Sequence, residues 1–393
     1  MRNNSKILIA TGIYPPDYRG PATLLEALPA ALRARGFEVK IITYSNVVGG
    51  EEERKKEGVW RISRKQNVLL RYVKYFLQMR ALARWSDIIY ATDTYSVGYF
   101  AYLLKKFSNK KYIIRFAGDS AWETASARGW TKDYIVDFQE KKYEARIEKL
   151  KKRRKKILVN ADKIIAVSNF IASVARRIGV DGNKIKVIYN SIDFIRESDI
   201  DPEAARNIGN HYSQGDAKII VTACQLMPWK GVDGIIKILP ALKEKIGPVS
   251  LLVLGEGQEL ENLQKLSEGL GVSEIVYFLG KIEHKNIINY YKAADLFILN
   301  TNYEALSYTL LEVMKVGTPI ITTNIGGNPE VIDDNKDGLL VTFNDEKQLA
   351  DAAIKILSDE EFAEKLTNNS RDKLQKFNWD SMVNQTIETI ENV

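Results

Sequence analysis

The stretch of residues 292–338 constrains the fold more than any other part of this 393-residue sequence. Its apolar run Leu296–Leu299 predicts a short buried strand, and Pro319–Thr322 predicts another. Between them, apolar residues recur with helical spacing from Leu306 to Met314. A strand, a loop, a helix and a strand in this order predict a parallel sheet. In such a sheet, the loops at the carboxyl ends of the strands bind ligands.

Two glutamates, Glu304 and Glu312, flank the start of this predicted helix. Along a helix axis their spacing corresponds to about 12 Å. We expect Asn302 or Ser307 to cap the helix, whose first N–H groups carry partial positive charge. A ligand with hydroxyls at both ends and phosphates in the middle matches this layout, as a sugar nucleotide does. Taken alone, the pair is equally explained as two solvated glutamates on an ordinary helix.

Four short motifs follow one another here. The glutamates with seven residues between them are followed by the tripeptide GTP, by GGNPE at Gly326–Glu330 and by DGLLV at Asp337–Val341. In this order they resemble the signature of the retaining GT-B glycosyltransferases of group 1, also numbered family four. The resemblance implies an α/β fold in which two Rossmann-like domains face each other across a cleft. It also implies a nucleotide-sugar donor on the second domain and an acceptor mostly on the first.

The resemblance and the recurring strand patterns extend over nearly the whole chain and predict its division. We expect an N-terminal acceptor-side domain over residues 1–200, a linker over 201–216, a C-terminal nucleotide-sugar-binding domain over 217–377, and a final helix over 378–393 that crosses back to the first domain. The linker is assigned because its residues are polar and are interrupted by proline and glycine.

The resemblance also implies donor contacts beyond the paired glutamates. Lys230, in a Lys-Gly dipeptide, corresponds to the family lysine that stabilises the departing diphosphate. Gln225 stands where the family carries arginine, so a neutral amide replaces a charge. The implied donor contacts are the backbone at Gly20, Gln225, Lys230, the backbone around Ile282, Glu304 on the sugar hydroxyls, the N–H groups of Ala305, Leu306 and Ser307, and Glu312 on the ribose. An exposed lysine at a helix start is the alternative for Lys230.

The loop after the predicted strand Lys111–Phe116 carries the acceptor-side candidates. Many relatives place a histidine where this chain has Ala117, and Asp119 follows two residues later. A carboxylate there would accept a proton from the attacking hydroxyl, although a Gly-Asp turn is the alternative. The other acceptor candidates are Arg19, Arg115 and Trp122, of which Trp122 also suits a core position. Catalytic roles are assigned to Asp119, Lys230 and Glu304.

Charge is distributed unevenly along the chain, whose formal net charge is +7. The first half is strongly basic and the second half is acidic, so the first half is expected to meet an anionic partner. An anionic membrane surface, a lipid phosphate and nucleic acid are the candidates. Nucleic acid ranks last because no aromatic-plus-basic RNA-binding module is recognisable, and none is expected as a partner. The basic run Lys149–Lys156 is either a solvated helix end or part of that membrane contact.

The remaining composition limits cofactors and location. Only two histidines are present, which excludes a histidine-rich metal site. We therefore expect no cofactor and no metal, with a UDP- or GDP-linked sugar as substrate. The sequence has no run of eighteen apolar residues and no secretory signal pattern. A cytoplasmic protein is expected, peripheral on the inner face of a membrane if the basic half docks there.

Three functions remain in competition. The first is a retaining glycosyltransferase of the hexosyltransferase type. It would move a sugar to a glycan, lipid-linked or small-molecule hydroxyl in polysaccharide or glycoconjugate biosynthesis. The second is a sugar-nucleotide epimerase of GT-B shape, which the scarcity of histidine disfavours. The third is a non-catalytic nucleotide-sugar or glycan-binding protein, which Gln225 and Ala117 keep open.

Overall fold

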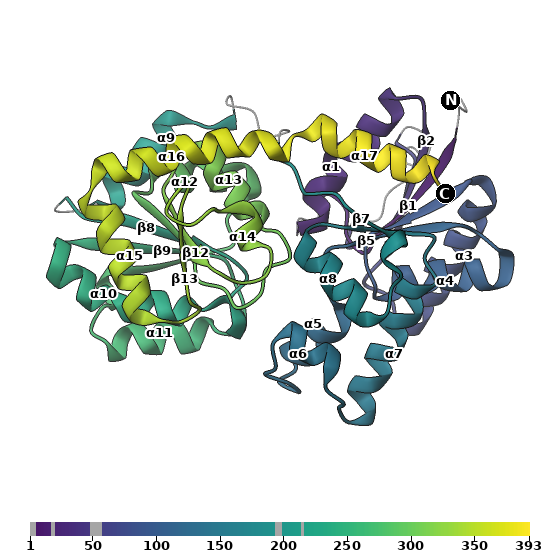
Figure 1. Cartoon of the computed structure of the whole chain (residues 1–393), viewed down its shortest axis with the longest axis horizontal. Coiled ribbons are helices and arrows are strands. Elements are labelled where there is room, and N and C mark those ends of the chain that lie inside the picture. Colours follow the sequence, from purple (N-terminus) through teal and green to yellow (C-terminus); the bar gives the residue numbers. More distant parts are fainter. Residues whose placement is uncertain (1–4, 17–19, 48–56, 193–198, 214–215) are drawn as a thin grey trace. The chain divides into compact units, whose positions relative to one another are not determined.

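The computed structural model describes residues 5–16, 20–47, 57–192, 199–213 and 216–393 (Figure 1). The chain forms two compact units. The first comprises Met1–Asn190 together with Trp379–Val393, and the second comprises Ser191–Asn378. Each unit is built on a parallel sheet covered by helices, so the predicted α/β class with two domains is correct.

The first unit contains a seven-stranded parallel sheet in the order β3-β2-β1-β4-β5-β6-β7. Its strands are β1 (Lys6–Ala10), β2 (Glu38–Ser45), β3 (Val59–Ser63), β4 (Ile88–Ala91), β5 (Tyr112–Phe116), β6 (Lys163–Ala166) and β7 (Ile185–Val187). Its helices are α1 (Gly20–Ala34), α3 (Val68–Trp85), α4 (Ser96–Ser108), α5 (Ser120–Ala127), α6 (Ile135–Glu140), α7 (Ala145–Val159), α8 (Asn169–Ile178) and α17 (Trp379–Glu391). The central strands are apolar at successive positions because helices cover both faces of the sheet.

The second unit contains a six-stranded parallel sheet in the order β10-β9-β8-β11-β12-β13. Its strands are β8 (Lys218–Ala223), β9 (Val249–Leu254), β10 (Val276–Gly280), β11 (Leu296–Leu299), β12 (Ile320–Thr323) and β13 (Leu339–Val341). Its helices are α9 (Pro202–Tyr212), α10 (Val232–Ile246), α11 (Leu260–Gly269), α12 (His284–Ala293), α13 (Tyr308–Val316), α14 (Asn328–Val331), α15 (Glu346–Ser358) and α16 (Glu360–Leu374).

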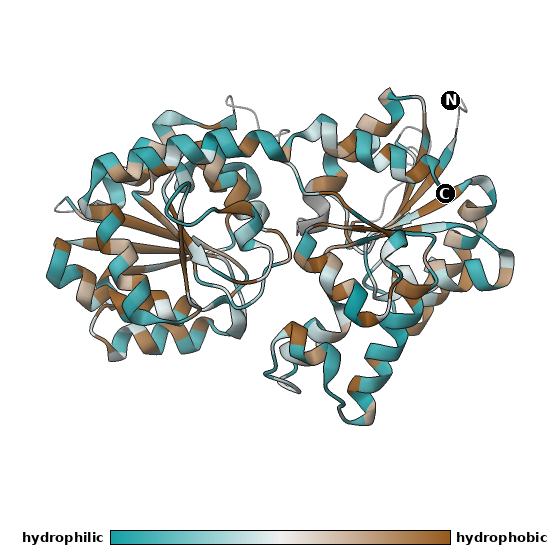
Figure 2. Cartoon of the chain, in the orientation of Figure 1, coloured by the Kyte–Doolittle hydropathy of each residue, from teal (hydrophilic) through white to brown (hydrophobic). Residues whose placement is uncertain are grey.

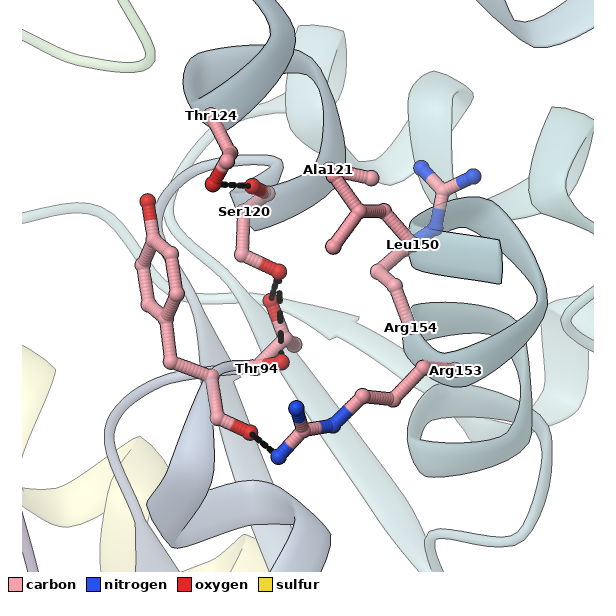
Figure 3. Close-up of a pocket in the computed structure, with 8 residues that line it drawn as sticks. Thr94, Ser120, Ala121, Thr124, Leu150, Arg153 and Arg154 are labelled. Carbon is pink, nitrogen blue, oxygen red and sulfur yellow. Dashed lines mark hydrogen bonds between the residues drawn. The ribbon is translucent and has the colours of Figure 1, made fainter. Parts of the chain in front are cut away.

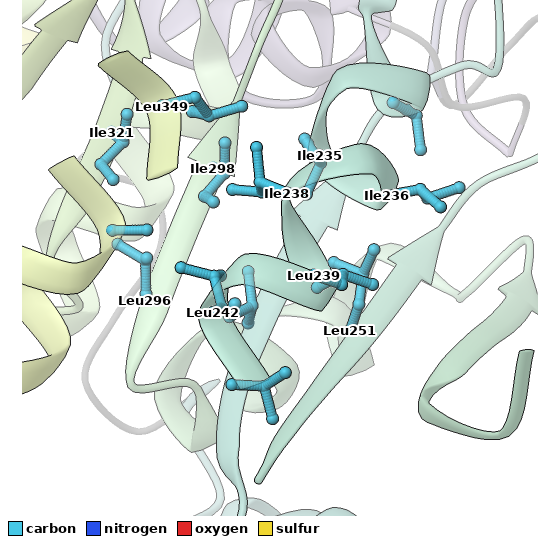
Figure 4. Close-up of a cluster of buried hydrophobic side chains, with 14 of the residues drawn as sticks. Ile235, Ile236, Ile238, Leu239, Leu242, Leu251, Leu296, Ile298, Ile321 and Leu349 are labelled. Atoms are coloured by element: carbon cyan, nitrogen blue, oxygen red, sulfur yellow. The ribbon is translucent and has the colours of Figure 1, made fainter. Parts of the chain in front are cut away.

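The core of the second unit shows what holds helix and sheet together. Leu239 and Leu242 of α10 pack among Leu251, Ile298 and Ile321 of three strands, all fully buried (Figure 4). Burial of each such side chain stabilises the fold by about 1.5–3 kcal/mol. Colouring by hydropathy shows the same distribution, with apolar strands inside both units and polar helix faces outside (Figure 2). None of the helices in the described residues combines the length and apolar character that a membrane-spanning segment needs.

Both sheets reverse their strand order next to the first strand of the unit. The reversal lies between β1 and β4 in the first sheet and between β8 and β11 in the second. Loops that leave neighbouring strands in opposite directions open a crevice at the carboxyl ends of the strands, where ligands of doubly wound sheets bind. The fold therefore directs attention to the loops that follow these four strands.

The predicted linker over residues 201–216 is wrong for most of its length. Helix α9 begins there, and the Asp201 carboxylate caps it by accepting hydrogen bonds from the N–H groups of Glu203 and Ala204, each at 3.0 Å. Pro202 was interpreted as a breaker, but it occupies the first helical turn, where its missing N–H costs nothing. Helix α9 packs against α12 within the second unit, and the boundary between the units falls after Asn190 rather than residue 200. Helix α17 belongs to the first unit, where it packs against α1.

Candidate active site

The loops that follow β8 and β11 are bound to each other. The Trp229 carbonyl accepts hydrogen bonds from the Asn302 N–H (2.7 Å) and from the Thr301 hydroxyl (3.1 Å). The Asn300 amide donates to the Gly231 carbonyl at 2.8 Å. Gly231 has φ of +54°, and a Cβ atom on it would lie 2.1 Å from the Asn300 carbonyl oxygen. Glycine is therefore required for this approach of two backbones.

This approach brings two predicted site residues together. Lys230 ends a short 3-10 turn over Pro228–Lys230, and its ammonium group forms an ion pair with the Glu304 carboxylate. Their side chains are 16% and 19% exposed, respectively. A ligand that enters from solvent can therefore reach both charges. The sequence assigned both residues to the donor but predicted no ion pair between them.

Both charges lie close enough to the thiol of Cys224 to influence its pKa. Burial raises the pKa of Cys224 to about 11, Lys230 lowers it and Glu304 raises it. The thiol therefore stays protonated at neutral pH and is a poor nucleophile. Cys224 directly follows β8.

Glu304 does not lie on helix α13, contrary to the spacing argument. The helix begins at Tyr308, and the Ser307 hydroxyl caps it by accepting a hydrogen bond from the Leu310 N–H at 3.2 Å. Of the two predicted caps, Ser307 is correct. Glu304 precedes the cap in a loop, so the 12 Å axial separation from Glu312 does not apply. From the sequence alone, the polar loop after β11 cannot be distinguished from the first turn of the helix. The capping residue has to be known first.

The GGNPE motif packs against this loop and holds its backbone in place. The Gly327 N–H donates to the Glu304 carbonyl at 2.9 Å. A Cβ atom on Gly327 would lie 2.1 Å from the Ala305 carbonyl oxygen, so a larger residue would displace the loop. The Asn328 amide donates to the hydroxyls of two threonines at the end of β12, at 3.0 and 3.2 Å. The motif thus fixes the backbone that carries Glu304.

Glu312 lies within α13 and is 4% exposed. Its carboxylate lies 3.1 Å from the His284 Nε2 atom, at the first position of α12. His284 is a site residue that the sequence argument missed. The available signal was a histidine shortly after a strand that ends at the same sheet edge. Ile282, in the same loop, is half-buried.

The first unit places Asp119 where it cannot contact an acceptor, and the predicted proton-accepting role is wrong. The side chain is fully buried. One carboxylate oxygen caps α5 by accepting a hydrogen bond from the Ala121 N–H at 3.0 Å. The other forms an ion pair with Arg154 and accepts a hydrogen bond from the Gln139 amide at 2.9 Å. Both oxygens are occupied inside the unit, so Asp119 is a structural residue.

The other acceptor-side predictions meet different outcomes. Trp122 is 3% exposed and its indole N–H donates to the Asp133 carbonyl at 2.9 Å, so it belongs to the core. Arg115 is 4% exposed and donates to the Asn190 side chain at 2.8 Å, which ties β5 to the end of the unit. Neither lines an open groove. Arg19 lies outside the described residues.

Asp93 is a better-placed carboxylate at the same sheet edge. It follows β4 at the reversal point, and its side chain is half-buried. Its carboxylate accepts a hydrogen bond from the Tyr95 N–H at 2.8 Å. A Cβ atom on Gly12, in the loop after β1, would lie 2.9 Å from the other oxygen. The Thr92 hydroxyl donates to the Thr11 hydroxyl at 2.8 Å, which joins the two loops.

The surroundings of Asp93 perturb its titration. Burial raises the pKa of Asp93 to about 6, while backbone N–H groups of the following turn and the Arg153 charge lower it. Its carboxyl group therefore changes charge near neutral pH, as groups in functional sites often do. Sequence reasoning missed Asp93 because its importance depends on knowing that β1 and β4 are neighbours.

Two cavities border these loops. One, of about 40 Å³, lies beside the loop after β4, where the Thr94 hydroxyl donates to the Ser120 hydroxyl at 2.7 Å next to Arg153 (Figure 3). A cavity of this volume has room for water but not for a sugar ring. The other, of about 420 Å³, lies between α10, α11 and the loop containing Met227 and Gly231, and none of the three charged donor candidates lines it. Within the described ranges, no cluster of three or more His, Cys, Asp or Glu side chains has the arrangement of a metal site.

Comparison with protein families agrees with this geometry. Residues 205–373 match the model described as "Glycosyl transferases group 1", and residues 18–196 match "Glycosyltransferase Family 4". The chain belongs to the group 1 glycosyltransferases. Its pair of α/β units is accordingly a GT-B fold, as the sequence motifs predicted.

Individual relatives and structures of this glycosyltransferase family differ in how much they share. A GDP-mannose-dependent alpha-(1-6)-phosphatidylinositol monomannoside mannosyltransferase of Mycobacterium tuberculosis is 29% identical over 190 residues, 46% of this chain and 49% of its own. The chain spans about half the length of the first curated relatives that it matches. Sucrose-phosphate synthase from Thermosynechococcus elongatus has a TM-score of 0.79 at 20% identity, covering 99% of this chain and 98% of its own. HepE of Anabaena, in complex with UDP-glucose, has a TM-score of 0.77 at 17% identity, covering 99% and 100%.

Other predicted donor residues lie at the expected sheet edge. Gln225, the second residue after β8, is exposed, and its carbonyl accepts a hydrogen bond from the Met227 N–H at 2.8 Å. Ala305 is half-buried and Leu306 is buried, so their backbone rather than their side chains would serve a ligand. Gly20 is the first residue of α1.

The structural role of Asp119 predicts a loss of stability. Asp119→Ala leaves the Arg154 charge buried without a counterion and should lower the free energy of unfolding by about 3–5 kcal/mol. Urea denaturation monitored by circular dichroism measures this. Asp137→Ala, an exposed carboxylate on the neighbouring helix α6, is the matched control and should change little. Equal unfolding midpoints for the Asp119→Ala variant and the wild type would refute the structural assignment.

Proposed function

We propose that this chain transfers a sugar from a nucleotide-sugar donor to a hydroxyl of an acceptor. The observation that carries the proposal is the meeting of Lys230 and Glu304 at the reversal point of the second sheet, beside the Ser307-capped start of α13. The cation and the helix start suit a diphosphate, and the carboxylate suits sugar hydroxyls. The complex of HepE with UDP-glucose and the GDP-mannose dependence of the mycobacterial relative support a UDP- or GDP-linked donor.

The donor would be held along the loop that precedes α13. The first N–H groups of a helix favour anionic groups, so Ala305–Ser307 and the helix start would receive the diphosphate. Lys230 would turn from Glu304 to the diphosphate and neutralise the charge that develops as the bond to the sugar breaks. Glu304 would then accept hydrogen bonds from the sugar hydroxyls. The proposal includes no metal cofactor, because the lysine and the helix start carry the phosphate charge.

In this proposal Lys230 alone supplies the positive charge that the family provides with a lysine and an arginine. Gln225 is neutral, but its exposed amide reaches solvent at the same loop and would donate hydrogen bonds to the diphosphate. Glu312, oriented by His284, would accept hydrogen bonds from the ribose hydroxyls. We further propose that the transfer retains the anomeric configuration, in keeping with the group 1 motifs.

The acceptor would bind the first unit at the carboxyl end of β4. Asp93, with Asp119 unsuited to the task, would accept a hydrogen bond from the acceptor hydroxyl while ionised. Glycans, lipid-linked sugars and small hydroxylated metabolites are the acceptor classes that fit this chemistry.

Removing Lys230 tests the transfer reaction. Lys230→Ala should lower the rate of transfer by about 100-fold or more, because a preorganised group that stabilises developing charge is lost. Mass spectrometry of the product and assay of the released nucleotide, over a panel of UDP and GDP sugars, measure this. Lys218→Ala is the matched control. This lysine pairs with Asp295 at 3.2 Å at the opposite ends of the same two strands, and its loss should leave the rate unchanged. A Lys230→Ala variant with wild-type turnover would disprove the assignment.

Nucleotide binding tests Glu312. Glu312→Ala should weaken the affinity for UDP or GDP by about 10-fold or more, because a hydrogen bond to a charged group contributes about 1.5–3 kcal/mol. Isothermal titration calorimetry gives the dissociation constants. Glu261→Ala, an exposed glutamate on α11, serves as control. His284→Ala should weaken binding in the same direction but less, since it orients Glu312. Unchanged affinity of Glu312→Ala for both nucleotides would rule out the ribose contact.

The pH dependence tests Asp93. Because its pKa is raised to about 6, the carboxyl group is ionised above that pH and protonated below it. The kcat/KM for the acceptor should therefore fall as pH drops below about 6, approaching 10-fold for each pH unit. Asp93→Asn should have a lower kcat/KM at neutral pH and should lack this decline, whereas Asp137→Asn should behave like the wild type. An Asp93→Asn profile that matches the wild type at every pH would show that another group titrates.

A further inference from the structure

Helix α3 exposes an unusual number of large apolar side chains. Of the ten exposed large hydrophobic residues in the described part of the chain, six lie on this helix. They are Val68 (54% exposed), Leu69 (72%), Leu70 (47%), Tyr72 (38%), Val73 (47%) and Leu77 (55%). A contiguous apolar patch of this kind on a folded protein marks an interaction surface.

These residues are not needed to pack the helix on its own unit. Helix α3 already buries Tyr75, Met79 and Leu82 on its inner side. Leu69, Val73 and Leu77 recur every fourth residue and therefore form a stripe, which the helical repeat places on the opposite side. The outer stripe is thus additional to the core-facing stripe.

The charges on the same helix indicate the kind of partner. Residues 68–85 contain four basic side chains and no acidic one. Helical spacing places Arg80 and Arg84 in line with the apolar stripe, one and two turns beyond it, and Lys74 at its flank. An outer face that is apolar in its first half and cationic in its second suits an anionic bilayer surface. There, aliphatic side chains enter the interface and long basic side chains reach the phosphates.

The neighbouring helix α4 extends this surface. Phe107, near its end, is 74% exposed, and the Lys106 ammonium lies 5.4 Å from its ring centroid. Helix α4 packs against α3 in the same unit. Figure 1 shows the two helices together at one edge of that unit.

The basic run Lys149–Lys156, which the sequence suggested as a membrane contact, has a different environment. Arg154 pairs with buried Asp119, and Arg153 donates to the Tyr95 carbonyl at 3.4 Å. Lys151 donates to the Lys141 carbonyl at 2.6 Å. The apolar residues of the same helix, Ile147, Ile157 and Leu158, are buried. Part of this run is therefore used inside the unit, and the described helix α7 has no exposed large apolar side chain to insert into a bilayer.

We propose that the outer face of α3 docks the chain on an anionic lipid bilayer, with Leu69, Val73 and Leu77 in the interface and Lys74, Arg80 and Arg84 on the lipid phosphates. The helix would lie on the surface, since no helix in the described residues can span a bilayer. This proposal does not depend on the transfer reaction, because docking needs neither donor nor acceptor.

Flotation of the full chain with lipid vesicles tests the proposal. The wild type should float with phosphatidylcholine vesicles that contain phosphatidylglycerol and remain unbound with pure phosphatidylcholine. Replacing Lys74, Arg80 and Arg84 by Gln should weaken binding to the anionic vesicles by about 100-fold. The pair Leu69→Ser and Leu77→Ser should weaken it as well, although it leaves the charge unchanged. All these positions are exposed or half-buried at the surface, so the urea unfolding midpoints should remain those of the wild type.

A second set of variants provides the matched control. Lys149→Gln, Lys152→Gln and Lys156→Gln remove the same charge from exposed positions of α7 and should retain most of the vesicle binding. Wild-type protein that fails to float with anionic vesicles would overturn the proposal. Equal losses for the α3 and α7 charge variants would overturn it too, since binding would then depend on net charge alone. The face would instead be a protein interface if sedimentation velocity showed a dimer that the Leu69→Ser and Leu77→Ser pair dissociates, with no vesicle binding by the wild type.

Discussion

The close approach of two backbones, at Gly231 and Asn300, is the constraint on which the second unit's site depends. Glycine alone permits it, because a Cβ atom would meet the Asn300 carbonyl oxygen at 2.1 Å. The approach lets the loop after β8 bond to the loop after β11, which places Lys230 beside Glu304. Gly327 approaches the backbone of the second loop equally closely, at the Ala305 carbonyl oxygen. The charged side chains are thus positioned by backbone contacts, and can change partners while the loops stay in place.

Two ion pairs in this chain differ in how deeply they are buried, and this difference limits what each pair can do. Asp119 and Arg154 are 0% and 3% exposed, whereas Lys230 and Glu304 are 16% and 19% exposed. A buried pair must keep its partner, because an isolated charge at low dielectric is very costly. A pair that borders solvent can exchange its partner for a ligand group at a much smaller cost. The same kind of ion pair is therefore structural in one unit and, in the proposed function, binds the ligand in the other.

Local pattern predicted the elements well and the partners of individual side chains poorly. The strand Leu296–Leu299 and the Ser307 cap follow from hydropathy and capping rules, because these depend on adjacent residues. The burial of Asp119 depends on Arg154, which lies 35 residues away in sequence, and no local signal reveals it. Asp93 and His284 gain their importance from strand order, which the sequence pattern left undetermined. Lys230 and Glu304, which the family motifs assign to one donor site, do meet in the structure, because such motifs carry long-range information.

In the first unit, Tyr75 links helix α3 to the edge of the sheet by hydrogen bonds. Tyr75, on the inner side of α3, donates its hydroxyl to the carbonyls of Thr11 and Ile42, each at 3.0 Å. Thr11 in turn accepts the hydrogen bond from Thr92, next to Asp93. Burial of Tyr75 raises the pKa of its hydroxyl well above the usual range, so this donor persists at all physiological pH values. A bilayer contact on α3 and an acceptor contact at Asp93 would then share one rigid unit. Among the acceptor classes that fit the chemistry, a lipid-linked sugar is the one that both features favour.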